Sequence, residues 1–217
     1  MPDAVLDGID HLIFAAADLD AAVGRLAQLT GITASAGGSH PGRGSRNALL
    51  RIGARRYLEV MAPDPAQVTH DLPAWFPFES LGDGGLMAWC ARASGDLRQQ
   101  HARAADAGVP LGAVREGRRA RPDGGELSWV MTEPTGQGNV DVLPFLIDWG
   151  STPHPSESAA AGLELIEFRL EHPDPQRIRG WLDAIGLAVL VAKGAAPALV
   201  ARLSSPRGEV ELQSPNR

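Results

Sequence analysis

The chain has a single cysteine, and this scarcity limits how it can be stabilised. Cys90 carries the only thiol among 217 residues, so no disulfide can form within the chain. A lone cysteine next to a tryptophan in an apolar run is typical of a small buried side chain. It fits a reducing compartment, and we expect a cytoplasmic protein.

Long hydrophobic runs and an excess of positive charge are also missing. No apolar stretch approaches the ~18 residues that a membrane-spanning helix needs, and residues 1–4 contain no basic segment like that of an export signal. The formal net charge is −6, which argues against general nucleic-acid binding, because such proteins present a basic surface. With 44% hydrophobic and 21% charged residues, the chain has the composition of a globular protein. Its expected partner is a small molecule.

Three helices are predicted at nearly constant intervals. Each ends at a glycine, the residue that most readily takes the left-handed conformation after a helix: Gly31, Gly108 and Gly186. The helices begin at Asp18, near Ser94 or Asp96, and at a first turn that contains Pro175. An apolar strand precedes each helix, over residues 9–17, 86–93 and 163–170. Shorter strands follow, over 48–52, 57–61, 127–131, 140–147, 199–203 and 210–212.

This strand, helix and strand order occurs three times, which predicts one supersecondary unit repeated along the chain. Hairpin spacing after each helix favours mixed sheets, hence an α+β fold of βαβββ units. Residues 1–150 would hold two paired units, the first over 1–63 and the second over 85–150, joined by a connector over 64–84. A linker over 151–162 would lead to a third unit over 163–217.

His11 and Glu59 are the most informative residues, because each lies in a short apolar run where a polar side chain is expensive to bury. A buried carboxylate must be paired or must bind a cation. An imidazole and a carboxylate suit Zn, Mn, Fe or Ni. The simpler alternative is a hydrogen-bonded structural pair.

Two stretches could contact a ligand. The loop over 37–47 offers glycine N–H groups, Arg43 and Arg46 as partners for an anion, His40, and Asn47 at its base. A second basic stretch contains four arginines, of which Arg115, Arg118 and Arg119 are expected on a solvated face and Arg121 in a fixed turn. The aromatic residues Trp89, Trp129, Phe145 and Trp149 could line a cup or could be ordinary core.

The chain resembles the glyoxalase-like branch of the vicinal oxygen chelate superfamily. The resemblance is carried by Asp10-His11-Leu12, Asp18-Leu19-Asp20, the loop from His40 to Asn47, Tyr57-Leu58-Glu59, Arg121-Pro122-Asp123-Gly124 and Pro144-Phe145. The resemblance covers the first 150 or so residues well. The third unit is matched mainly by its pattern of strands and helix. It implies a glyoxalase/bleomycin-resistance-like fold in which two units form one cupped mixed sheet.

In that superfamily each unit supplies metal ligands from its first and last strands. The resemblance implies His11 and Glu59 as ligands from the first unit. In the second unit it places Trp89 opposite His11, and the last strand carries no carboxylate. A third ligand would have to come from His40, or alternatively from His154.

Two functions remain open. The first is a metal-assisted lyase, isomerase or dioxygenase acting on a small anionic or oxygenated metabolite, with Glu59 or His40 transferring a proton. Its substrate contacts would be Arg43, Arg46, Asn47, Trp89, Arg121 and Trp129. The second is a metal-free protein that binds or sequesters a small molecule. The unpaired third unit would cover a sheet edge or support a homodimer.

Overall fold

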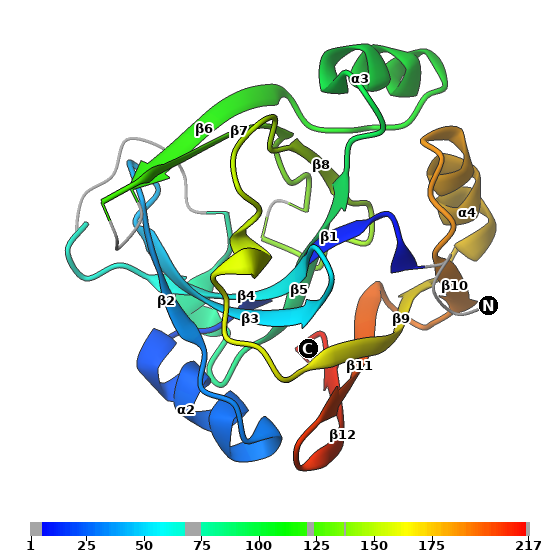
Figure 1. The fold of residues 1–217 in the computed structure, drawn as a ribbon. Helices are drawn as coiled ribbons and strands as arrows, with labels where there is room; N and C mark the ends of the chain where they lie inside the picture. Colours follow the sequence, from blue (N-terminus) through cyan, green and yellow to red (C-terminus); the bar gives the residue numbers. More distant parts are fainter. Residues whose placement is uncertain (1–5, 68–74, 121–123, 137, 216–217) are drawn as a thin grey trace.

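The computed structural model describes residues 6–67, 75–120, 124–136 and 138–215. An eight-stranded mixed sheet in the strand order β2-β3-β4-β1-β5-β8-β7-β6 forms the main body, and a separate four-stranded sheet packs beside it (Figure 1). This arrangement confirms the predicted α+β fold of βαβββ units.

The first unit forms one half of the large sheet. Its elements are β1 (Ile9–Ala15), α2 (Leu19–Thr30), β2 (Ser35–His40), β3 (Ser45–Gly53) and β4 (Arg56–Pro63). The predicted helix ends are confirmed: the Asp18 side chain accepts a hydrogen bond from the Ala21 N–H at 2.8 Å, and Gly31 has φ 82°. Strands β1 and β4 run parallel, so the first and last strands of the unit are neighbours.

The second unit repeats this pairing. Its elements are β5 (Gly85–Arg92), α3 (Leu97–Asp106), β6 (Val114–Ala120), β7 (Glu126–Thr132) and β8 (Phe145–Asp148). Strands β5 and β8 are parallel, and an antiparallel β1–β5 pair joins the two units. The connector and the linker contain the short 3-10 helices η1 (Phe78–Ser80) and η2 (Pro155–Glu157).

Three predicted segments differ from the structure. The expected loop over 37–47 is mostly the β2–β3 hairpin, and the stretch with Arg115, Arg118 and Arg119, for which no strand was predicted, is strand β6. The strand expected over 140–147 is limited to β8. Glycines and charged residues have low strand propensity, so local patterning hides strands whose formation depends on their neighbours in the sheet.

The third unit keeps the element order but changes the pairing. Its elements are β9 (Glu164–His172), α4 (Pro175–Ala184), β10 (Leu190–Lys193), β11 (Ala198–Ser205) and β12 (Gly208–Gln213). The strand order is β10-β9-β11-β12, so the first strand pairs with the second and third rather than with the last. The sequence pattern repeats three times, whereas the sheet topology repeats twice.

Two apolar clusters lie on opposite faces of the large sheet. One joins helices α2, α3 and α4 with the third unit, and Trp89 packs on Phe168 there with ring centroids 5.3 Å apart. The other lies on the concave face. The third unit therefore covers a face of the large sheet, and the expectation that it covers an edge is wrong.

Trp89 does not lie opposite His11. The β1–β5 register pairs His11 with Cys90 and Leu12 with Trp89. The register shifts between Ile9 and His11 and between Ile13 and Phe14. A shift of one residue changes which side chains of the two strands share a face of the sheet. Trp89 is therefore core, with its indole N–H donated to the Val142 carbonyl at 3.0 Å. Its expected role in substrate binding is wrong.

The large sheet curls strongly. Strands β2 and β6 lie at opposite ends of its strand order, yet they contact each other. Within the described part of the chain, no helix is long and apolar enough to cross a membrane.

Candidate active site

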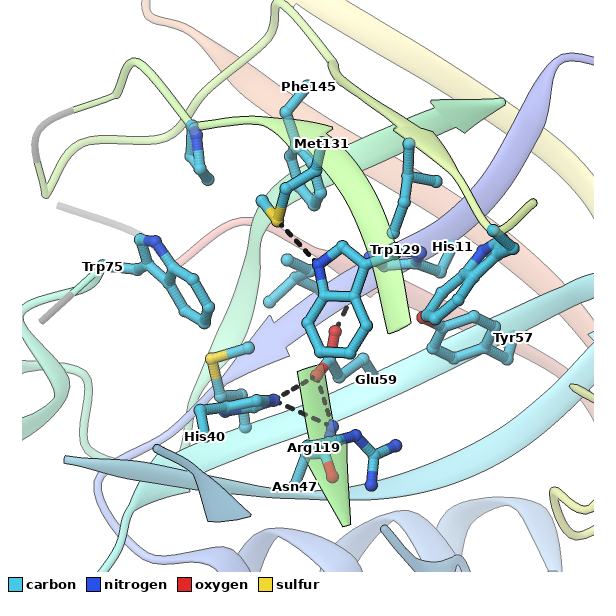
Figure 2. A pocket seen from close by; sticks show the side chains of 15 residues that line it. His11, His40, Asn47, Tyr57, Glu59, Trp75, Arg119, Trp129, Met131 and Phe145 are labelled. Carbon is cyan, nitrogen blue, oxygen red and sulfur yellow. Dashed lines mark hydrogen bonds and ion pairs between the residues drawn. The ribbon is translucent and has the colours of Figure 1, made fainter. Parts of the chain in front are cut away.

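The concave face of the sheet encloses a narrow pocket of about 40 Å³, which is room for a few water molecules. Side chains of a strand alternate between its two faces. Tyr57, Glu59 and Met61 of β4 therefore line the pocket, and the side chains of Leu58 and Val60 do not. Figure 2 shows the lining side chains, which also include His11, Ile13, His40, Asn47, Trp75, Arg119, Trp129, Met131, Pro134, Phe145, Ile147 and Trp149.

A β-bulge places Asp10 and His11 together. Consecutive strand residues normally face opposite sides, but the register shift between Ile9 and His11 leaves Asp10 without a partner residue in β5. The Asp10 carboxylate contacts His11 Nδ1 at 2.8 Å, His154 Nε2 at 3.1 Å and Trp149 Nε1 at 3.3 Å. Tyr57 stacks on the His11 ring with centroids 4.5 Å apart. His11 is thereby fixed with Nε2 directed at Glu59.

Glu59 lies between the two histidines of the pocket. His11 Nε2 is 3.6 Å from Glu59 Oε2, and His40 Nε2 is 3.3 Å from Glu59 Oε1. Asn47 donates a hydrogen bond to Oε1 and is held by the Gly38 N–H, which donates to Asn47 Oδ1 at 2.9 Å. Asn47 is therefore a support for Glu59.

The carboxylates of Glu59 and Asp10 are both held in the charged form. Burial alone raises the pKa of Glu59, but the hydrogen bond and charge of His40, the charge of His11 and the bond from Asn47 lower it to about 2. Burial likewise opposes ionisation of Asp10, while its contacts with His11 and His154 bring its pKa well below the usual value. Two buried negative charges need positive charge beside them.

His40 is oriented in the same way as His11. Its Nδ1 lies 2.9 Å from the Ser45 hydroxyl, across the turn that joins β2 to β3. Its Nε2 faces Glu59 and lies 3.3 Å from Asn47 Nδ2. Both pocket histidines therefore use Nδ1 for support and present Nε2 to the same carboxylate.

This donor set fits a divalent cation in its chemistry and in two of its spacings. Two imidazole nitrogens and one carboxylate match the 2-His-1-carboxylate type. Metal–ligand bonds of about 2.0–2.2 Å place neighbouring donors roughly 3.0–3.5 Å apart, close to the observed 3.3 and 3.6 Å. Each histidine meets its own oxygen of Glu59, and the three donor atoms do not all lie within 4.8 Å of one another. One cation could therefore bind all three residues only if an imidazole moved inward.

A second possible metal-binding group adjoins the first. In the parts of the chain that the structure describes, Asp10, His11 and Cys90 are the one group of three or more potential ligands whose donor atoms all lie within 4.8 Å of one another. Burial, with Asp10 and Glu59 nearby, raises the pKa of the Cys90 thiol well above its usual value, which disfavours a thiolate. Asp10 is already occupied by His11, His154 and Trp149. His11 Nε2 faces Glu59 instead, so two alternative donor groups meet at His11.

The sequence profile of the glyoxalase-like domain matches residues 9–186. The chain belongs to the glyoxalase-like domain family. The fold is that of the vicinal oxygen chelate superfamily, as the sequence predicted. No curated protein matches the chain by sequence.

Solved structures of the same fold are distant in sequence. A hypothetical protein from Staphylococcus aureus is 14% identical, with a TM-score of 0.58, and the alignment covers 96% of this chain and 86% of that one. Methylmalonyl-CoA epimerase from Streptomyces coelicolor, in complex with 2-nitronate-propionyl-CoA, is 20% identical over 68% of this chain and 98% of that one, with a TM-score of 0.46. The Mycobacterium tuberculosis epimerase is 23% identical over 69% and 93%, with a TM-score of 0.43.

The two halves of the pocket in this glyoxalase-like domain differ in character. The first unit contributes His11, His40, Asn47 and Glu59. From the second unit, β7 and β8 contribute apolar or aromatic side chains: Trp129, Met131, Phe145 and Ile147. Trp129 lines the pocket as predicted, and its indole N–H meets the Met131 sulfur at 3.2 Å.

The predicted arginines do not frame this pocket. Arg43 pairs with Glu133 and lies over the Trp75 ring at 4.7 Å, outside the lining of the pocket. Arg46 is half-exposed and pairs with Asp20 at 3.2 Å. Nearby carboxylates hold both side chains. Arg43 lines a second pocket that shares His40, Trp75 and Trp129 with this one, so its role in substrate binding stays a prediction, as does that of Arg46. Arg121 lies outside the described residues.

His154 stands behind His11. It contacts Asp10 through Nε2 and Ser156 through Nδ1 at 2.7 Å, so Asp10 separates it from the pocket. This placement removes His154 as the alternative third ligand. His11, His40 and Glu59 converge as predicted, while the roles assigned to them remain proposals.

Sequence reasoning missed three residues of the site. Asp10 was visible as an acid directly before His11, but the bulge that turns it inward has no local signal. Tyr57 lies two positions before Glu59, and strand alternation would have placed it on the same face. Arg119 was assigned to a solvated surface, yet only 5% of it is exposed and it lines the pocket.

Proposed function

We propose that this glyoxalase-like domain is an enzyme that binds a small oxygenated metabolite in the concave pocket and transfers a proton on it with the help of a divalent cation. One observation carries the proposal. Glu59 is buried, ionised and set between two histidines, each oriented by a separate hydrogen bond. Both imidazoles line the pocket, where a ligand can reach them.

His11, His40 and Glu59 would hold the cation. When bound, it would act as a Lewis acid on a substrate oxygen. Glu59 is the proposed proton acceptor, and His40, whose Nε2 lies 3.3 Å from Glu59 Oε1, can take the proton on. Asp10 and Asn47 act as positioning residues, since they hold His11 and Glu59 in place. Trp129 and Phe145 would exclude water from the opposite wall.

A second candidate is a metal-free binding protein. The apolar wall from β7 and β8 favours it, because the second unit brings Phe145 and Ile147 where a chelating half-site would stand. In that case His11, His40 and Glu59 would form a proton-balanced structural cluster, and the pocket would retain its ligand without chemistry.

Proton exchange separates the two functions. We would incubate the protein, with and without added Mn²⁺, Zn²⁺ or Ni²⁺, with small 2-oxo and 2-hydroxy carbonyl compounds in D₂O. Loss of the proton beside the carbonyl would be followed by ¹H NMR. The enzyme proposal predicts metal-dependent exchange that falls about 10²- to 10⁴-fold in Glu59→Gln.

The matched control is Glu126→Gln, an exposed carboxylate on β7, which should leave exchange unchanged. Tight binding of a compound without exchange, unaffected by metal, would support the binding protein instead. Exchange that persists in Glu59→Gln would refute the assigned role of Glu59.

A further inference from the structure

Arg119 places a buried positive charge in the pocket. It lies near the end of β6, on the edge strand that curls round to contact β2. Only 5% of the residue is exposed, and it lines the same pocket as His11, His40 and Glu59. Figure 2 shows it among the lining side chains, with Asn47 and Glu59. The curl of the sheet thus brings an arginine of the second unit to the polar side of the first.

Its guanidinium group is incompletely satisfied. Arg119 Nη1 is buried and has no hydrogen-bond partner. Over the described residues, no ion pair involves Arg119, because the oxygens of Glu59 are occupied by Asn47, His40 and His11. A buried donor without a hydrogen-bond partner is costly. A ligand carboxylate in the pocket would supply the missing acceptor for Nη1.

We propose that Arg119 is the anchor for a carboxylate group of the ligand. The proposal rests on the proposed function for the location of the reacting atoms, and it names the substrate class: a small monocarboxylate with a short apolar body. The planar guanidinium can bind a carboxylate in a bidentate geometry, with two parallel N–H···O hydrogen bonds. A single carboxylate balances one arginine, whereas a doubly charged phosphate would be repelled by ionised Glu59.

The apolar wall supplies the rest of the recognition. Tyr57, Trp129, Phe145 and Trp149 surround the space beside the charged groups. An aromatic wall and one cation form a site for a carboxylate joined to an apolar group. The carboxylate would bind at Arg119 while the rest of the ligand lies toward Glu59.

Acetate and acetamide provide a matched pair of probes, because they have nearly the same shape, differ in charge and are small enough for this pocket. Binding to the metal-free full-length protein would be measured by calorimetry and thermal shift, with isobutyrate and isobutyramide as a larger pair. We expect each carboxylate to stabilise the protein and each amide to have little effect. Arg119→Gln should weaken carboxylate binding about 10- to 100-fold, the effect of a charge-assisted hydrogen bond.

Arg118→Gln is the control, since Arg118 is exposed on the same strand and should not alter binding. Glu59→Gln should keep or strengthen carboxylate binding while it abolishes proton exchange, so a failure of the enzyme proposal and a failure of the anchor can be told apart. Equal binding of acid and amide, no binding of either carboxylate, or unchanged binding in Arg119→Gln would overturn the proposal. If Arg119→Gln does not fold, the comparison of acid with amide in the unmodified protein decides alone.

Discussion

At the residue scale, the site depends on charges that are buried together. Asp10 and Glu59 are almost fully buried and ionised, and His11 lies between them with Nδ1 on one and Nε2 near the other. The sequence pointed to His11 and Glu59 because polar residues in apolar runs are conspicuous. It could not point to Arg119, because a cluster of arginines has the same local pattern whether its side chains meet solvent or a pocket.

The low pKa of Glu59 makes a prediction about stability and pH. Its pKa is about 2 in the folded protein and near 4.5 when unperturbed. A carboxyl group with a lowered folded pKa stabilises the fold above its unfolded pKa, and that contribution disappears as the pH falls toward its folded pKa. The difference in unfolding free energy between the unmodified protein and Glu59→Gln should therefore be constant above about pH 5 and shrink between pH 4.5 and 2. Urea titrations at several pH values would measure it, with Glu126→Gln as the control. A difference independent of pH would contradict the assignment.

Asp10→Asn should affect both stability and the orientation of His11. Asparagine keeps the shape but loses the charge and one acceptor, so His11, His154 or Trp149 loses its partner. Removing one member of a buried charged network typically costs about 3–5 kcal/mol, and removing the support of a ligating histidine lowers metal affinity about 10- to 100-fold. Urea unfolding and Mn²⁺ titration would report the two effects separately. Asp106→Asn, at an exposed position of α3, should change neither, and an unaltered Asp10→Asn would argue against the network.

At the element scale, local signals placed the helices and failed for two strands. The helix ends were predictable because Asp18 and Gly31 act on their immediate neighbours. Strands β2 and β6 were not, since they are built from glycine, serine and arginine and form by pairing with β3 and β7. The bulge at Asp10 is invisible for the same reason. These two strands and the bulge carry His40, Arg119 and Asp10, so part of the site could be seen only in the fold.

Gly37 on β2 is required by close packing with Asn47. A Cβ atom there would lie 1.9 Å from Asn47 Oδ1, so Gly37→Ala should push Asn47 away from Glu59. We expect a loss of about 1–3 kcal/mol from overpacking, together with reduced proton exchange. Chemical denaturation and the exchange assay would test both. At Gly24 in α2, an added Cβ atom would meet no atom within 4 Å, so Gly24→Ala should be neutral or slightly stabilising. Equal effects of the two substitutions would show that Asn47 does not need this contact.

At the scale of the whole molecule, the third unit shares a core with the face of the large sheet opposite to the pocket. Phe168 of β9 packs on fully buried Trp89 of β5. Phe168→Ala should therefore destabilise the entire chain by about 3–5 kcal/mol, and unfolding should remain a single transition. Circular dichroism during urea unfolding would follow this transition, and acetate binding should persist in the absence of urea. Two separate transitions would instead identify the third unit as an independent domain.

Glu59, with His11 and His40, is proposed to hold a divalent cation. The most direct test is to titrate tag-free, metal-stripped protein with Mn²⁺ and to detect the bound ion by electron paramagnetic resonance. Zn²⁺ is then added as a competitor. We predict one Mn²⁺ per chain, displaced by Zn²⁺, with affinity lost in Glu59→Gln and His11→Ala and retained in Cys90→Ser. Absence of binding to the unmodified protein, or loss of affinity in Cys90→Ser with none in Glu59→Gln, would contradict this account.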